Sequence, residues 1–388
     1  MLKEIIVITP LYVSLFWAVV FFTASFSANK ARYWLGVFML VVSVLYGCHA
    51  AYFLGFQQLY LKLDSLYLLA GLSVYPMYYL YIRLLTCDLK LKWLYFRHFI
   101  PAFVIFAALF LSGRMASPEE QRVYFETVLV KNEFPGGEAP ALVKTMAVIF
   151  FLSRLVFGLQ TLVYLVLGYQ LAKKYNQRIA NFYSNMEGRE LVWVNLLTTS
   201  LLTTSVLSFI VNLLGRGFFM EKLWLMAVPS LLFSSLFFII GLQGNRQNFN
   251  IKSLDDDEKK DGGEGKNSTG QRHEKLKHNL LNLLEKKKIY LEPELKITDL
   301  CPKLNTNRTY LSNLINTEFN LSFNDLINKY RIEHAISIIK NDTENQTSIQ
   351  EIATASGFGS LSSFNRAFQK NTGVAVGRFK NENSSPGA

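Results

Sequence analysis

Long apolar stretches dominate the chain up to residue 243, and the period of amphipathic helices takes over from about residue 273. A helix needs about 20 mainly apolar residues to cross a hydrocarbon core about 30 Å thick. Seven stretches approach or exceed this length, the fourth being the shortest: residues 5–27, 34–54, 65–85, 98–113, 146–170, 191–214 and 222–242. Because a buried helix of a soluble protein rarely lacks a polar face over such lengths, residues 1–243 are predicted to form a seven-helix transmembrane bundle.

Basic residues are concentrated on one side of the predicted bundle. The loops after the first, third and fifth spans hold Lys30, Arg32, Lys90, Lys92, Arg97, Lys173, Lys174, Arg178 and Arg189. The other side has fewer basic residues, and its one long loop, residues 117–140, is net acidic. Since cytoplasmic loops carry the excess of Lys and Arg, we expect a multi-pass protein of the inner (cytoplasmic) membrane, with its N-terminus outside and its C-terminus in the cytoplasm.

The first span has a second interpretation as a secretory signal, because "TASFSA" places small residues near its end. Its apolar run is longer than the core of a usual signal peptide, and basic residues follow it rather than precede it. We therefore expect a membrane anchor.

Residues 244–272 are polar and rich in Gly and charged side chains. Such a composition does not bury enough apolar area to fold, so we expect a flexible linker, through which the seventh span is coupled to the tail. The string "GGEGKNST" resembles a phosphate-binding loop only superficially, because it lacks the G-x-x-x-x-G-K-[ST] spacing and no predicted strand precedes it.

Residues 273–388 are predicted to form a separate helical domain. The stretch "TDLCPKLNTNRTYLSNLINTEF" predicts a helix, a short turn and a second helix, with Thr298 capping the first and Asn307 the second. One long helix, "SFNDLINKYRIEHAISIIKN", follows, and "SIQEIATASGFGSLSSFNRAFQKNTG" predicts another helix-turn-helix with Gly357 at its turn. The expected fold class is all-α: a transmembrane bundle followed by a cytoplasmic domain with two helix-turn-helix units.

The second helix of each unit leaves polar side chains facing outward, and these are the candidate DNA contacts: Asn307, Arg308, Thr309, Ser312 and Asn313 on one, and Ser360, Ser362, Ser363, Asn365, Arg366 and Lys370 on the other. Arg and Asn suit guanine and adenine edges, whereas Ser, Thr and Lys suit phosphates. The connecting helix is about 27 Å long at 1.5 Å per residue, and major grooves recur about 34 Å apart on one face of DNA. The pattern predicts binding of double-stranded DNA in two successive grooves.

The tail resembles the DNA-binding domain of the AraC/XylS family of transcription regulators. The residues in register with the family pattern are Arg331, Ile332, Ala335, Ile352, Ala353, Gly357, Phe358, Phe364, Arg366, Phe368 and Gly373. The chain departs from that pattern at Ala375 and Val376, where Thr-Pro is usual, at Ser363, where an aromatic is usual, and at Ile315, where Phe is usual. The resemblance implies DNA binding, and members fused to multi-span membrane domains imply a one-component sensor.

Ionisable side chains inside the predicted spans are candidate functional residues. His49 and Arg154 lie near the outer ends of the second and fifth spans, and Asp64 lies at the outer end of the third. We expect these three to line the mouth of a pocket for an unknown small-molecule, peptide or lipid signal. The alternative is structural, with each side chain snorkelling to the surface or capping a carbonyl.

Catalytic and metal chemistry finds little support in the residue pattern. Cys48, Cys87 and Cys301 form no CxxC pair, so we predict no metal site, no cofactor and no enzyme activity. A sensor kinase is one alternative, because His273 and His278 follow the spans, but the nucleotide-binding glycine boxes of a kinase are missing. Another is a membrane sensor or transporter whose tail is a protein-interaction or local regulatory module.

The formal net charge of +11 is divided between the loops of the apolar half and the polar tail. The function predicted from all these features is a membrane-bound transcription regulator that responds to a membrane or extracellular signal. Ligand-driven homodimerisation and proteolytic release of the tail are the two routes of signalling that a flexible linker favours.

Overall fold

A computed structural model of the chain describes residues 2–23, 30–87, 93–187, 189–214, 218, 223–246, 270–342 and 346–384. The chain forms two compact units. The first contains Met1–Ala172 and Leu191–Asn248, and the second contains Lys173–Glu190 and Phe249–Ala388. The connection between the fifth and sixth apolar helices therefore belongs to the C-terminal unit, although the sequence analysis placed it in the membrane domain.

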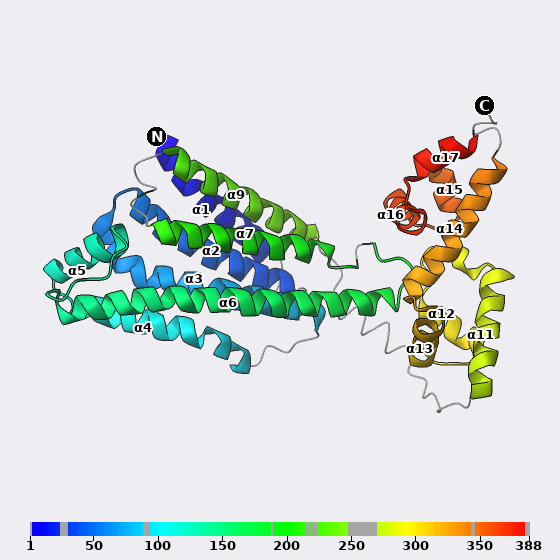
Figure 1. The fold of residues 1–388 in the computed structure, drawn as a ribbon, viewed down its shortest axis with the longest axis horizontal. Helices are drawn as coiled ribbons and strands as arrows, with labels where there is room; N and C mark the ends of the chain where they lie inside the picture. Colours follow the sequence, from blue (N-terminus) through cyan, green and yellow to red (C-terminus); the bar gives the residue numbers. More distant parts are fainter. Residues whose placement is uncertain are drawn as a thin grey trace. The chain divides into compact units, whose positions relative to one another are not determined.

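The first unit is a bundle of long apolar helices (Figure 1). These helices are α1 (Leu2–Phe22), α2 (Lys30–Phe53), α3 (Gln57–Thr86), α4 (Ile100–Met115), α6 (Ala141–Ala180), α7 (Val192–Leu214) and α9 (Leu223–Arg246). Helix α1 packs against α2 and α9, and α3 packs against α2 and α4. Among the described residues, seven helical stretches are long and apolar enough to cross a membrane, which confirms the number predicted from the sequence.

The fourth and fifth spans are both longer than predicted. A 3₁₀ helix, η1 (Trp93–Phe99), precedes α4, and together they give an apolar stretch of 23 residues. Helix α6 has 40 residues, about twice the length that a bilayer core requires. Residues from Lys173 onward in α6 are part of the C-terminal unit.

The acidic loop between α4 and α6 is partly helical. It forms α5 (Pro118–Tyr124) and a π-helical turn, η2 (Phe125–Val130). Ser117 and Glu120 make a capping box in which each side chain accepts a hydrogen bond from the other residue's backbone N–H. This Ser-x-x-Glu pattern before an apolar run is a local signal for a helix start that the sequence analysis did not use.

The second unit is a small helical domain built around α14 (Phe323–Asn341). Its other helices are α11 (Gly270–Glu285), η3 (Ile289–Leu291), α12 (Ile297–Leu304), α13 (Arg308–Phe319), α15 (Ile349–Ala355), α16 (Leu361–Thr372) and α17 (Val376–Ser384). Helix α14 packs against α13, η3, α15, α16 and α17. The described residues contain no β-strand and one isolated bridge, so the predicted all-α fold class is confirmed.

Capping in this unit follows the sequence with one correction. Asn307 caps α13, as predicted, because its side-chain oxygen accepts the backbone N–H three residues further on at 2.8 Å. Thr298 does not cap α12, which already begins at the preceding residue. There the carboxylate of Asp299 accepts the backbone N–H of Lys296 at 2.7 Å, since a side chain at the third helical position reaches back to the N-cap.

Most of the predicted linker lies outside the described residues. Its two ends are helical rather than irregular, because α9 continues to Arg246 and α11 begins at Gly270.

Candidate nucleic-acid interface

Helix α13 presents the first set of candidate DNA contacts. Three aliphatic side chains fix it against the core, each at most 1% exposed: Leu311, Leu314 and Ile315. Four candidates keep partial or full exposure: Arg308, Thr309, Ser312 and Asn313. The side-chain oxygen of Asn307 accepts the hydrogen bond of the helix cap, so a contact of Asn307 with DNA would use its amide NH₂.

Two glycines with positive φ lie before and after α16. Gly357 has a φ of 82° and forms the turn after α15, where a Cβ would lie 2.7 Å from the carbonyl oxygen of Leu291. Gly373 has a φ of 77° and ends α16 in open space. Glycine adopts this conformation without the steric penalty of other residues, so the predicted role of Gly357 in the turn is confirmed and close packing adds to it.

Helix α16 presents the second set of candidate contacts. Its inner side is buried by Phe364, Ala367 and Phe368. Ser360 caps the helix by accepting the backbone N–H of Ser363 at 3.2 Å. The remaining candidates are exposed: Ser362, Asn365, Arg366 and Lys370.

Acidic side chains already pair with the two basic residues of α16. Arg366 pairs with Glu190, and Lys370 pairs with Asp325 on α14. The side chains of Arg366 and Lys370 remain 60% and 67% exposed. DNA therefore has access to both cations but must compete with a carboxylate for each of them.

A buried arginine on α14 connects this helix to η3, to the residues that follow η3, and to Ser184. Arg331 is 1% exposed. Its guanidinium donates to the carbonyl oxygens of Tyr290 at 2.7 Å and Glu292 at 2.6 Å, and to the hydroxyl of Ser184 at 3.2 Å. Burial lowers the pKa of Arg331 to about 10, so it stays protonated at neutral pH. The family resemblance placed Arg331 in register, but the sequence pattern did not indicate its burial.

The long helix α14 separates the two helix-turn-helix units. It has 19 residues and is therefore about 28 Å long. Both α13 and α16 pack against it, so their spacing depends on one continuous element. Entry into successive grooves about 34 Å apart stays a prediction.

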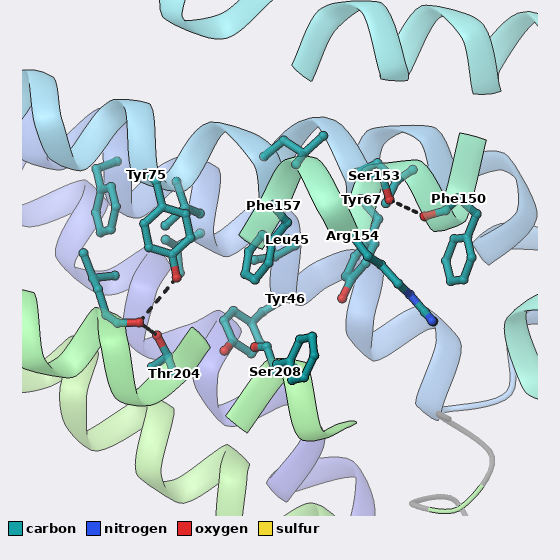
Figure 2. A pocket seen from close by; sticks show the side chains of 18 of the residues that line it. Leu45, Tyr46, Tyr67, Tyr75, Phe150, Ser153, Arg154, Phe157, Thr204 and Ser208 are labelled. Carbon is teal, nitrogen blue, oxygen red and sulfur yellow. Dashed lines mark hydrogen bonds between the residues drawn. The ribbon is translucent and has the colours of Figure 1, made fainter. Parts of the chain in front are cut away.

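The first unit contains a cavity of about 290 Å³ among α2, α3, α6, α7 and α9. Figure 2 shows its mainly apolar and aromatic walls, which include Tyr46, Tyr67 and Phe157. Its polar lining includes Arg154 and Ser208. Cavities of about 300 Å³ and larger with a few polar groups are typical of small-molecule sites.

Two of the three predicted pocket residues line cavities of the first unit. Arg154 lines the 290 Å³ cavity, and His49 lines an adjoining one of about 110 Å³, which shares Tyr46, Tyr67 and Ser208 with it. Asp64 is 3% exposed, and its carboxylate accepts hydrogen bonds from the hydroxyls of Tyr60 and Tyr124, each at 2.8 Å. Asp64 therefore joins α3 to the short helix α5.

The fold and the two capped, exposed recognition helices define the C-terminal unit as a domain of the double helix-turn-helix class. Comparison with known proteins agrees: residues 300–382 match the family described as "Helix-turn-helix domain". The predicted resemblance is thereby confirmed for this domain, which is of the AraC type.

Two curated relatives are regulatory proteins. The chain is 35% identical over 81 residues to the TCP pilus virulence regulatory protein of Vibrio cholerae serotype O1, a match that covers 21% of this chain and 28% of that protein. It is 30% identical over 88 residues to the Msm operon regulatory protein of Streptococcus mutans serotype c, covering 23% of this chain and 31% of that protein. The chain thus matches less than a third of the length of these relatives. No solved structure matches it.

Proposed function

We propose that this chain is a membrane-bound transcription regulator, not an enzyme, that binds double-stranded DNA through α13 and α16 in response to a signal received by its membrane bundle. The observation that carries the proposal is the pair of recognition helices, each capped at its N-terminus and each fixed to α14 by buried apolar side chains. The same chain carries seven helices of membrane-spanning length.

The exposed side chains suit distinct roles at a DNA surface. Arg366 has the two donors that recognise guanine in the major groove, and Asn365 has the donor and the acceptor that recognise adenine there. Thr309, Ser362 and Lys370 suit phosphate contacts, which orient a protein without specifying sequence. Recognition helices usually contact bases with their N-terminal residues. Thr309 and Ser362 lie in the first turn of their helices, Asn365 and Arg366 lie in the middle of α16, and Lys370 lies in its last turn.

We propose that the C-terminal unit faces the cytoplasm and that the N-terminus faces outward, in the cytoplasmic membrane. The basic residues between spans one and two, three and four, and five and six support this orientation. Double-stranded DNA is available only on that side, so the proposed orientation and the proposed partner agree.

We propose the cavity beside Arg154 as the site where the signal binds. Its aromatic walls suit an apolar body, and the guanidinium of Arg154 with the hydroxyl of Ser208 suits an anionic or polar head. Ionisable residues at membrane depth carry a cost and are usually functional. The cavity is lined in part by residues of α6 and α7. The connection between these two helices is one of the loops that we propose to lie in the cytoplasm.

Footprinting of the full chain in cells tests the proposed function. We expect defined sites for the wild type, and a loss of about 1–3 kcal/mol at those sites for Arg366→Ala, equivalent to about 5- to 150-fold weaker binding. Arg378→Ala is the matched control, because Arg378 is an exposed arginine on α17 paired with Glu382. The absence of any enriched site for the wild type would refute the proposal.

A further inference from the structure

The connection between α6 and α7, which the structure describes at residues 181–187, 189 and 190, lies along the rest of the C-terminal unit as if it were an added strand. The backbone N–H of Ile297 donates to the carbonyl of Phe182, and the N–H of Ser184 donates to the carbonyl of Leu295, each at 3.0 Å. Tyr183 and Lys296 form the antiparallel bridge between these two pairs. We call this connection the α6–α7 segment.

The core of the α6–α7 segment is as buried as the interior of a domain. Phe182 is 0% exposed, Tyr183 is 2% exposed and Ser184 is 1% exposed. The carbonyl of Ser184 accepts the side-chain amide of Asn324 at 2.6 Å, and its hydroxyl accepts from Arg331 at 3.2 Å. Burying two aromatic rings and pairing the polar groups between them is the chemistry of specific docking.

A polar cluster holds the edge of the α6–α7 segment. The carboxylate of Glu294 accepts the amide of Asn185 at 2.7 Å and the guanidinium of Arg189 at 2.8 Å. Burial of Glu294 acts to raise its pKa, but these two donors outweigh it and the pKa is lowered. The guanidinium of Arg189 also lies over the ring of Tyr183, with 4.4 Å between its central carbon and the ring centroid.

The docked segment contacts residues of both recognition helices. On α13, the Arg308 guanidinium carbon lies 6.0 Å from the ring centroid of Phe182. On α16, Glu187 accepts the hydroxyl of Ser360, and Glu190 pairs with Arg366. All three partners are candidate DNA contacts. The two carboxylates thus interact with the side-chain groups that would contact the phosphates and bases of DNA.

We propose that the α6–α7 segment competes with DNA for the recognition helices. Its two carboxylates and its Phe182 ring contact residues that DNA would bind, and DNA binding requires these contacts to break. This inference rests on the proposed function. It also gives the membrane bundle a second route to the tail, because the segment is covalently joined to α6 and α7, which both line the Arg154 cavity. The route expected from the sequence was the seventh span and its linker.

The acidic contacts are partly exposed to solvent, so breaking them should change DNA affinity only modestly. The side chain of Glu190 is 18% exposed and that of Arg366 is 60% exposed, so solvent screens the pair substantially. Exposed pairs change an equilibrium by about 1.4- to fivefold each. Neutralising both carboxylates is therefore expected to strengthen DNA binding by about two- to 25-fold.

The test compares three full-length proteins in lipid nanodiscs: wild type, Glu187→Gln with Glu190→Gln, and a control with Glu274→Gln and Glu333→Gln. The control removes the same charge from exposed positions on α11 and α14. Each protein is titrated against a fluorescein-labelled duplex of mixed sequence, about 30 base pairs or three helical turns long, with anisotropy as the readout. We expect the segment variant to bind about two- to 25-fold more tightly than the control.

The other outcomes separate the two proposals. Equal affinity of the segment variant and the control would overturn the proposal that the segment competes with DNA, because DNA affinity would then depend only on net charge. Weaker binding by the segment variant would also overturn it and would make the segment a support for DNA binding. If none of the three proteins binds DNA, the proposed function itself fails. In the wild type, saturating duplex should also speed amide exchange within residues 181–187, because linkage is reciprocal; unchanged exchange would contradict release.

Discussion

The turn of the second helix-turn-helix makes a sharp prediction about two glycines. Gly357→Ala and Gly373→Ala both place a Cβ at a positive φ, which costs about 1–2 kcal/mol. Alanine also lowers the conformational entropy of the unfolded chain, which offsets about 0.4–1 kcal/mol of this cost. The net loss of folding free energy at Gly373 is therefore about 1 kcal/mol. At Gly357 the added Cβ would also lie 2.7 Å from the carbonyl oxygen of Leu291 and 2.8 Å from its Cα. Overpacking of this kind adds about 1–3 kcal/mol, giving a total loss of about 2–4 kcal/mol.

Hydrogen exchange of the full chain, followed by mass spectrometry of peptides from α15 and α16, measures this difference. Tryptophan fluorescence would not report it, because all five tryptophans lie outside the C-terminal unit. At 1.4 kcal/mol per tenfold change, Gly373→Ala should speed exchange about fivefold, and Gly357→Ala about 30- to 700-fold. Equal acceleration by the two variants would refute the argument that contact with Leu291 constrains this turn.

Three further predictions concern the same domain. Arg331→Met should lower the stability of the C-terminal unit by about 3–5 kcal/mol, because buried acceptors lose a charged donor; exchange protection of α14 close to wild type would contradict this. Asn307→Ala should cost about 1 kcal/mol, seen as faster exchange confined to the first turn of α13. Hydrogen bonds from Lys277 and His273 lower the pKa of Glu318, so its contribution is full above its ordinary pKa of about 4.3 and is lost as the pH falls through the lowered value. Glu318→Gln should therefore reduce protection of α11 at pH 6, and the difference from wild type, compared at each pH, should vanish in strong acid.

Local patterns predicted most of the helices and the faces that they bury. The seven apolar stretches and the cap at Asn307 depend on residues near one another in the chain, and the structure has all of them. The buried faces of α13 and α16 followed in the same way from helical spacing. Thr298 was mistaken for a cap because two neighbouring side chains competed for one helix start, and the carboxylate of Asp299 made the bond.

Contacts between distant parts of the chain could not be predicted in this way. Arg331 is buried because three carbonyl groups far from it in sequence converge on its guanidinium, and nothing in the pattern of α14 signals that convergence. The docking of the α6–α7 segment is equally non-local. Its one local sign was the pair Phe182 and Tyr183, two aromatic residues inside an otherwise polar connection. The placement of His49 and Arg154 in two adjoining cavities likewise depends on how the helices pack, since both lie at similar predicted depths.

Sequence-specific DNA binding by the full chain tests the central claim most directly. The measurement is anisotropy of the nanodisc-held protein on a duplex recovered by footprinting and on a scrambled duplex of equal length, at one salt concentration. We expect at least about a thousandfold preference for the recovered duplex. Arg366→Ala should reduce this preference about 5- to 150-fold, and Arg378→Ala should leave it unchanged. Equal affinity for the two duplexes, or equal effects of the two arginine variants, would contradict the central claim.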